Sequence, residues 1–313
     1  MTILSKLTMA LLGAALTLPA YSDAATLAAW SQYGNDGKVE ARIVTDEAAC
    51  PALSVDGASQ PMAERSSGVV EFPIRVCVGN IPLGAKSVSA GGKTLPVPAA
   101  RPHHIVVIGD TGCRLKGDLV QACNDENAWP FKAVATHAAD EHPDLVIHVG
   151  DYYYRETPCK AGDTRCAGTP TGDNWPSWQA DLFSPAGKLM GAAVWLAARG
   201  NHEDCKRGGL GWTVLLGRDP ANTRCIAHEK PLFLDIGGVK LALLDDNDAD
   251  DKPGVIAPAA AALKSDLSAV TAAKANWIIT HHPFHGINKV ASGNQAEGGN
   301  DTLNEALTGF DEG

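Results

Sequence analysis

The chain has 313 residues and a formal charge of −10, and 45% of its residues are hydrophobic and 20% charged. This length allows two domains, or one large domain, with a sizeable core, and the composition argues against wholesale disorder. A protein that reads a nucleic-acid backbone normally presents a basic face, so the acidic balance predicts no nucleic-acid partner.

The N-terminus is typical of a secretory signal peptide. Residues 1–6 carry one positive charge, and residues 7–18 form an uncharged stretch that is largely apolar. Small residues near Ser22 provide a cleavage site. The alternative is a membrane anchor, but a bilayer span needs about 20 apolar residues. We therefore predict a signal peptide over residues 1–22 and a periplasmic or secreted protein that has no membrane segment after cleavage.

The cysteines agree with export. An even number in an exported chain favours disulfides. The alternative is a thiolate metal site, which the absence of any C-x-x-C pair disfavours. The sequence leaves the connectivity open, and our prediction is that neighbours pair, because each pair then closes its own short loop. The eight cysteines would form the pairs 50–77, 113–123, 159–166 and 205–225.

Residues 23–100 are predicted to form a small all-β domain, similar to a sandwich. Short β-rich runs at 39–44 and 72–78 are separated by turn signals such as Asn35-Asp36-Gly37. The proline-rich stretch 95–102 then predicts a stiff, extended linker.

Residues 101–313 show a different pattern, in which strands alternate with helices. This alternation indicates an α/β domain with some antiparallel pairing. Apolar runs predict strands at 105–108, 145–149, 193–197 and 277–280, and a glycine-centred hairpin of strands at 232–236 and 239–244. Helices are predicted at 129–141 and 257–273.

Polar residues follow strand after strand in this region. The segments are Gly109–Gly112, Gly150–Tyr154, Gly200–Glu203 and His281–His285. In open α/β sheets, ligands bind at the carboxyl ends of the strands. A single Gly-Asp after a strand is usually a turn, but four such segments offering Asp, Tyr, Asn and His suit hard cations such as Fe, Zn or Mn.

This ordered pattern resembles the calcineurin-like metallophosphoesterases, and within them the purple acid phosphatases. The family motifs D-x-G, G-D-x-x-Y and G-N-H-E match residues 110–112, 150–154 and 200–203, and V-x-x-H matches 278–281 with isoleucine in place of valine. The resemblance covers roughly residues 100–290. It implies a metallophosphoesterase-type mixed β-sheet sandwich flanked by helices.

The resemblance also implies a site with two metal ions. Asp110 and Tyr154 would bind Fe(III), Asp151 would bridge the ions, and Asn201 and His281 would bind a divalent Fe, Zn or Mn ion. Two such ions would activate a water to hydroxide and neutralise the charge of a small phosphorylated substrate.

Two histidines are implied as catalytic residues. His202 would contact the substrate phosphate and stabilise the transition state or protonate the leaving oxygen, and His285 would share that duty. Glu203 is expected to orient the site.

Other residues near the motifs are expected to be structural. These are Tyr152 and Tyr153 as packing residues, His282 as an orienting residue, His103 and His104 as solvated residues, and the acidic cluster Asp245, Asp246, Asp248, Asp250 and Asp251 as a solvated loop instead of a calcium site.

The last family motif is missing. No G-H-x-H follows His281 before Gly313, and in the family those histidines complete the two metal sites. Residues 302–307 resemble the helix that precedes the missing strand. We therefore expect an incomplete sequence without its C-terminal strands, which would leave an exposed sheet edge and apolar surface.

The resulting functional hypothesis is an exported metal-dependent phosphoesterase that hydrolyses phosphate monoesters, in the manner of an acid phosphatase. One alternative is a phosphodiesterase or nucleotide hydrolase that uses the same site. The other is a catalytically inert phosphate-binding or truncated relative that lacks the last two histidine ligands. The sequence does not indicate an oligomeric state.

Overall fold

The computed structural model describes residues 25–219, 224–249, 256–289 and 295–308. The predicted signal peptide therefore lies outside the described residues. A seven-stranded sheet forms the centre of the molecule, in the order β5-β6-β2-β1-β13-β12-β9. Its strands are β1 (Thr26–Tyr33), β2 (Val39–Thr45), β5 (Ala63–Ser66), β6 (Arg75–Ile81), β9 (Ile105–Ile108), β12 (Leu145–His148) and β13 (Val194–Ala197).

The N-terminal region consists of strands, as predicted, apart from the 3-10 turn η1 (Asn35–Gly37). It also forms a second sheet, in the order β4-β3-β7-β8. Its strands are β3 (Ala52–Val55), β4 (Ala58–Pro61), β7 (Val88–Ala90) and β8 (Lys93–Leu95). Strand β1 pairs in parallel with β13, where Gln32 lies opposite Trp195, so N-terminal strands extend the sheet that carries the motifs. The domain boundaries at residues 22 and 100 stay a prediction.

The expected strand at 72–78 begins later, at Arg75. Pro73 has no backbone N–H to give to a ladder, and Phe72 instead pairs with Val69 across a tight turn. Phe72, Ile74, Val76 and Cys77 of that run are nevertheless buried.

Alternate side chains of the central sheet enter two different cores. Val146 and Trp195 belong to one core, and Leu145 and Leu196 to the other. The first core is covered by α1 (Phe131–Asp140), α2 (Trp175–Trp178), α3 (Gly187–Met190), α4 (Gly209–Gly211) and the π-helices η2 (Gln179–Phe183) and η4 (Trp212–Leu216). The second is covered by the four-stranded sheet and by a three-stranded sheet of β14 (Leu232–Ile236), β15 (Val239–Leu243) and β16 (Trp277–Ile279).

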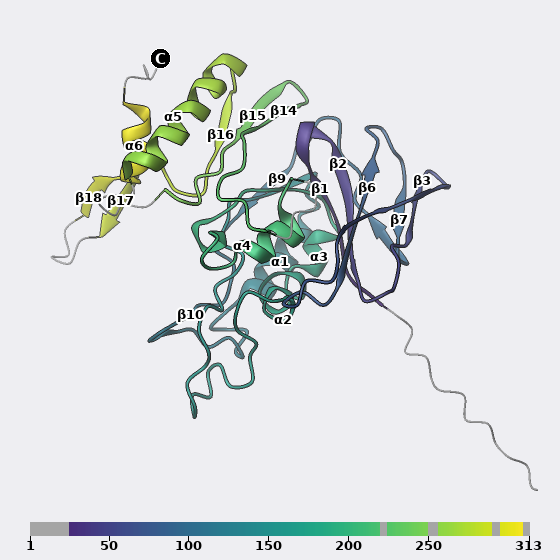
Figure 1. The fold of residues 1–313 in the computed structure, drawn as a ribbon. Coiled ribbons are helices and arrows are strands. Elements are labelled where there is room, and N and C mark those ends of the chain that lie inside the picture. Colours follow the sequence, from purple (N-terminus) through teal and green to yellow (C-terminus); the bar gives the residue numbers. More distant parts are fainter. Residues whose placement is uncertain (1–24, 220–223, 250–255, 290–294, 309–313) are drawn as a thin grey trace, which may run out of the picture.

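A C-terminal layer completes the sandwich at the end opposite β3 and β7 (Figure 1). The elements are α5 (Ile256–Ala273), the hairpin β17 (Gly286–Lys289) and β18 (Gln295–Gly298), and α6 (Asp301–Leu307), which confirms the helix predicted at 302–307. Both helices share one core with Ala242 of β15 and with Leu244, which follows that strand. The structure thus has the mixed sandwich with flanking helices that the sequence predicts.

Two strands present apolar side chains to solvent. Strands β9 and β16 are outermost in their sheets as far as the chain is described. Val107 on β9 is 60% exposed, and Trp277 and Ile278 on β16 are 48% and 43% exposed. Each of these two strands thus carries exposed apolar side chains at the edge of its sheet, within the described residues.

All four predicted disulfides are formed, with Cα–Cα separations of 5.5–5.7 Å. Cys113–Cys123 closes a loop that contains the small hairpin of β10 (Leu115–Lys116) and β11 (Leu119–Val120). Three of the bridges hold the loops that follow β9, β12 and β13, and such bridges are typical of an oxidising compartment. None of the helices in the described part of the chain has the length and apolar character needed to cross a bilayer.

Candidate active site

The motif-bearing segments meet because the strands that precede them end together. Strands β9, β12 and β13 are parallel and in register, with Ile108, His148 and Ala197 side by side. The turns after these strands must therefore lie at one edge of the sheet. Strand β16 brings the fourth segment to the same place from the neighbouring sheet, as the contact of His281 with the β12 turn shows.

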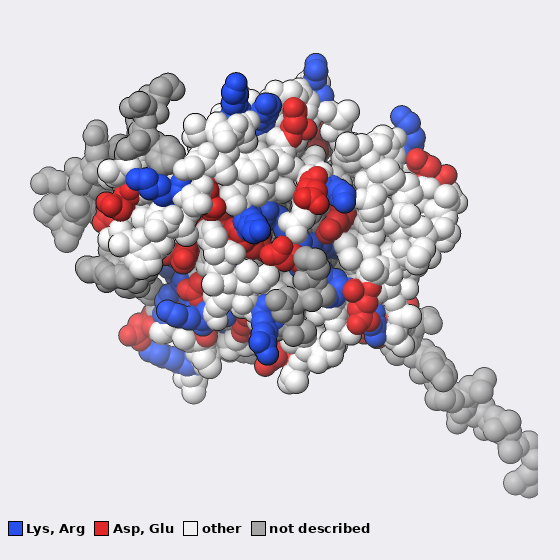
Figure 2. All heavy atoms as spheres, turned by 45° about the horizontal axis from the view of Figure 1, so that its top comes forward, with Lys and Arg blue, Asp and Glu red and all other residues white. Residues whose placement is uncertain are grey.

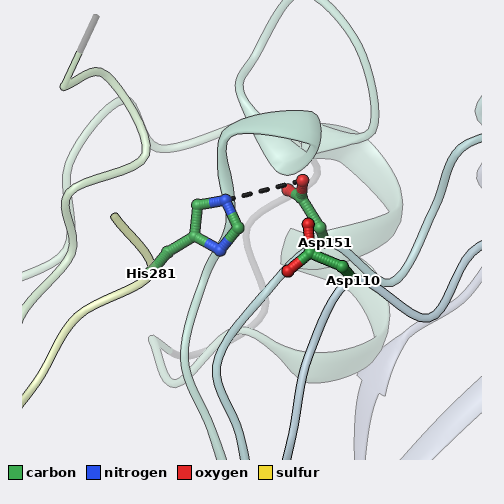
Figure 3. A group of neighbouring side chains, drawn as sticks. All are labelled: Asp110, Asp151 and His281. Atoms are coloured by element: carbon green, nitrogen blue, oxygen red, sulfur yellow. Dashed lines mark ion pairs between the residues drawn. The ribbon is translucent and has the colours of Figure 1, made fainter. Parts of the chain in front are cut away.

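Four of the five predicted metal ligands form one cluster. Potential ligand atoms of Asp110, Asp151 and His281 all lie within 4.8 Å of one another. The ring of His281 points towards Asp151, with Nε2 3.5 Å from Oδ2 (Figure 3). The Tyr154 hydroxyl lies 2.7 Å from Asp110 Oδ1 and 2.6 Å from Asp151 Oδ2.

This donor set fits metal ions. Two carboxylates, a phenol and an imidazole are ligands that hard and borderline cations prefer. His281 Nδ1 donates to the Val149 carbonyl at 2.8 Å, which leaves Nε2 to face the carboxylates, as in metal-binding histidines. Burial acts to lower the pKa of His281, but the interactions with the Asp151 carboxylate act in the opposite direction, and the pKa is raised to about 9. The cluster therefore already stabilises positive charge at this point.

The turns of the motifs have an unusual backbone conformation and approach each other closely. Asp110 and Asp151 have φ values of 54° and 60°, in the left-handed region that residues with side chains rarely adopt. Gly150 has a φ of 106°, and a Cβ there would lie 2.6 Å from the Cα of Gly200. Only glycine allows the two turns to approach this closely.

Glu203 holds the turn that carries Asp151, which agrees with the predicted orienting role. Its fully buried carboxylate accepts backbone N–H groups from Tyr152 and Tyr153 on Oε1 and from Asp151 and Gly200 on Oε2, at 2.9–3.1 Å. Burial and the charge of Asp151 raise the pKa of Glu203 to about 8, and the amide donors act in the opposite direction.

Glu203→Gln is expected to lower the free energy of unfolding by about 1–3 kcal/mol, because the amide NH₂ would face backbone N–H donors and leave them without an acceptor. Urea unfolding measures this loss. Glu126→Gln is the matched control, since the Glu126 side chain is 74% exposed and pairs only with Lys132 among the interactions described. Equal free energies of unfolding for the two variants would show that the contacts of Glu203 with the backbone amides contribute no net stability.

His202 lies against the cluster without belonging to it. Its backbone N–H donates to Asp151 Oδ1 at 2.9 Å, while its ring Nε2 is 3.9 Å from Asp151 Oδ2. The other ring nitrogen, Nδ1, lies 2.5 Å from Glu156 Oε1. Glu156 thus lies against Nδ1, and Nε2 is on the side of the carboxylates.

Asn201 and His285 are less closely tied to the cluster. Asn201 opens the 3-10 turn η3 (Asn201–Glu203) and, with His202, lines a cavity of about 680 Å³. His285 is exposed, precedes β17 and is not a member of the ligand group among the described residues. The metal role of Asn201 and the catalytic role of His285 stay predictions.

The prediction of a solvated acidic loop is wrong for Asp245 and Asp246, which are buried. Strand β15 ends beside β16, so the residues that follow it also face the site. Asp246 accepts the backbone N–H groups of His281 and His282, at 2.9 and 2.7 Å, and thereby positions the predicted ligand His281. Asp245 pairs with Arg199 at 3.3 Å. Asp250 and Asp251 lie outside the described residues.

His148 is a further residue that the motifs do not identify. It is the last residue of β12, fully buried, and its ring stacks on Tyr152 with centroids 3.9 Å apart. Nδ1 accepts the Gly150 N–H at 3.2 Å, so Nε2 carries the proton and donates to Thr111 Oγ1 at 2.9 Å. Burial lowers the pKa of His148 to about 3, which keeps the ring neutral. The His148 ring therefore links the first two motif turns through hydrogen bonds to Thr111 and Gly150.

We expect His148 to make folding sensitive to acid. The unfolded chain protonates this ring below about pH 6.5, whereas the folded chain does not until about pH 3, so stability falls as pH drops through this interval. The contribution to the slope reaches about 1.4 kcal/mol per pH unit. Urea unfolding of the chelator-treated protein between pH 7 and 4 should give a shallower dependence for His148→Gln. Parallel curves would contradict this expectation.

Tyr152 and Tyr153 pack as predicted, and their hydroxyl groups are used away from the cluster. The Tyr152 hydroxyl donates to the Ala198 carbonyl and the Tyr153 hydroxyl to the Arg155 carbonyl, both at 2.8 Å. His103 and His104 are exposed, as predicted.

Comparison with known proteins identifies a family and a similar fold. The sequence profile of the calcineurin-like phosphoesterase family matches residues 103–311. No curated protein matches the chain. Among solved structures, PhoD is similar in fold, with 13% identity, a TM-score of 0.51 and coverage of 92% of this chain and 68% of that chain.

A second similar structure is a purple acid phosphatase from yellow lupin (Lupinus luteus) seeds. It shares 14% identity at a TM-score of 0.47, and the match covers 84% of this chain but 52% of the lupin chain. This chain thus spans about half the length of the lupin enzyme. The family profile covers about two thirds of the sequence, and the chain belongs to the calcineurin-like phosphoesterase family.

Proposed function

We propose that the protein is an exported, metal-dependent phosphomonoesterase of the acid phosphatase type. The observation that carries this proposal is the cluster of Asp110, Asp151, Tyr154 and His281 beside an open cavity. Membership of the phosphoesterase family supports the reaction class. The four disulfides support export.

The residues divide into those that hold cations and those that contact substrate. Asp110 and Tyr154 would hold one cation, Fe(III) in this proposal, Asn201 and His281 a divalent one, and Asp151 would lie between them. When bound, such ions neutralise phosphoryl charge and make a water acidic enough to attack near neutral pH.

His202 would act on the phosphoryl group. Its backbone N–H holds Asp151, and its ring is nearly buried at the cavity wall, with Nε2 on the side of the carboxylates. A protonated Nε2 in this place can stabilise the phosphoryl oxygens and then give its proton to the leaving oxygen. Glu156 Oε1 lies 2.5 Å from Nδ1 and would form an ion pair with the protonated ring.

The role of Tyr154 predicts a visible spectrum. In the iron-loaded protein, a phenolate bound to Fe(III) gives a charge-transfer band, so Tyr154→Phe should abolish the colour. Tyr152→Phe and Tyr153→Phe are matched controls and should keep it, because these hydroxyl groups bond to carbonyls elsewhere. Absorption spectra of the three variants at equal iron content decide the matter. A band that survives Tyr154→Phe would show that another residue supplies the phenolate.

The proposed reaction is tested with p-nitrophenyl phosphate and bis(p-nitrophenyl) phosphate. We expect turnover of the monoester to exceed that of the diester, and a chelator to abolish both. Faster turnover of the diester would replace this proposal with the phosphodiesterase alternative. No turnover of either ester by metal-loaded protein would favour the inert phosphate-binding alternative. N-terminal sequencing of the protein recovered after export tests cleavage near residue 22.

A further inference from the structure

The cavity next to His202 is larger than a phosphoryl group requires. Its volume is about 680 Å³, within the range of small-molecule sites, and Asn201 and His202 form part of its wall. Because these two residues adjoin the carboxylate cluster, a phosphate bound there would place its leaving group in the cavity. The residues that line the rest of the cavity would then contact the leaving group.

Three cationic side chains line this cavity although the chain as a whole is acidic. Lys116 comes from β10, inside the loop closed by Cys113–Cys123, and Lys206 and Arg207 follow Cys205, which pairs with Cys225. Two disulfide-closed loops thus bring positive charge to one place. The face seen in Figure 2 carries basic and acidic side chains interspersed with one another.

The three cations differ in the ion pairs that they already form. Arg207 binds the Asp204 carboxylate through Nε and Nη2, at 3.1 and 2.9 Å, and Lys116 lies 3.4 Å from Glu156. Lys206 is exposed, and no ion pair is formed by its ammonium group within the described ranges. Lys206 is therefore the cation with the most capacity to bind a further anion.

Two acidic residues also line the cavity. Asp204 is engaged by Arg207, and Asp248 is exposed, so three basic side chains face two acidic ones in the lining. The remaining wall is polar apart from two alanines and the Cys205 sulfur. These polar side chains can hydrogen-bond to a polar leaving group.

We propose that this cavity selects phosphate monoesters whose polar leaving group carries a second anionic group, and that Lys206 binds that group together with Lys116 and Arg207. Sugar bisphosphates are the probe class. The inference rests on the proposed phosphomonoesterase function, because it assigns the leaving-group side of the same site.

The test compares kcat/KM for fructose 1,6-bisphosphate and fructose 6-phosphate in the metal-loaded protein. We expect the bisphosphate to be preferred about tenfold, and Lys206→Ala to reduce that preference about three- to tenfold, as a partly exposed charge-assisted contact would. Lys160→Ala is the matched control. Lys160 is an exposed lysine in another disulfide-closed loop, paired with Asp118, so its loss changes net charge equally.

A binding measurement separates this inference from the reaction. Pyrophosphate should raise the Tm of the metal-loaded protein more than inorganic phosphate does, and Lys206→Ala should reduce the difference while Lys160→Ala does not. If these shifts appear without any ester hydrolysis, the anion site stands and the proposed function fails. Hydrolysis with equal kcat/KM for the two sugars, or equal effects of the two lysine variants, would overturn the inference.

Discussion

Asp151→Asn is expected to remove at least one metal ion per chain and nearly all phosphatase turnover. Asp151 is nearly buried at the centre of the cluster: Oδ1 accepts the His202 N–H, and Oδ2 contacts the Tyr154 hydroxyl and His281 Nε2. Burial acts to raise the pKa of Asp151, but the contacts with His281 and Tyr154 hold it far below its usual range. Asparagine keeps the shape and removes the charge that would hold two cations together.

Elemental analysis and turnover of p-nitrophenyl phosphate measure both losses. Asp140→Asn is the control, because this exposed aspartate on α1 pairs with Lys188 at the surface and should affect neither quantity. Circular dichroism shows whether each variant is folded. If folded Asp151→Asn retains two metals, Asp151 does not bridge them.

His202→Ala is expected to keep the metals and to lower kcat by about 10²–10⁴-fold, the usual range for loss of a general acid. The ring lies beside the ligand cluster and Glu156 instead of within the ligand group. The loss should be larger for an alkyl phosphate than for p-nitrophenyl phosphate, because nitrophenolate leaves without needing a proton. His103→Ala is the control, since His103 is exposed and its backbone N–H bonds to Asp144.

Two outcomes would change the assignment of His202. Loss of metal comparable to that of Asp151→Asn would make His202 a ligand. Retention of metal and of full activity would transfer the proton donation to His285 or to solvent. A loss of equal size for alkyl and nitrophenyl esters would point to binding of the phosphoryl oxygens in place of proton transfer.

The elements with strong local patterns could be predicted from the sequence. The apolar run at 105–108, the hairpin of β14 and β15 and the alanine-rich helix α5 appear close to their predicted bounds. Strand β1 was not predicted, because its sequence Thr26–Tyr33 places the polar residues Ser31 and Gln32 in a fully buried position. Their burial depends on acceptors distant in the sequence, such as the Leu216 carbonyl that Gln32 reaches. No local pattern reports such a partner.

The candidate site also has residues that could be predicted from the sequence and residues that were not predicted. Asp110, Asp151, Tyr154 and His281 follow strands within short motifs, and the in-register parallel strands bring them together as expected. The residues that orient them come from elsewhere: Asp246 is 35 residues from His281, to whose backbone it bonds. The acidic run after β15 was the available signal, and its position after a strand was the same cue that identified the other segments.

Metal content measured together with activity tests the central claim most directly. The full-length protein should contain about two metal ions per chain, lose both the ions and p-nitrophenyl phosphate hydrolysis on chelation, and regain both when iron with a second divalent metal is restored. Hydrolysis that persists in protein shown to be free of metal would contradict the account. So would metal-loaded, folded protein in which Asp110→Ala, Asp151→Asn and His281→Ala leave the metal content unchanged.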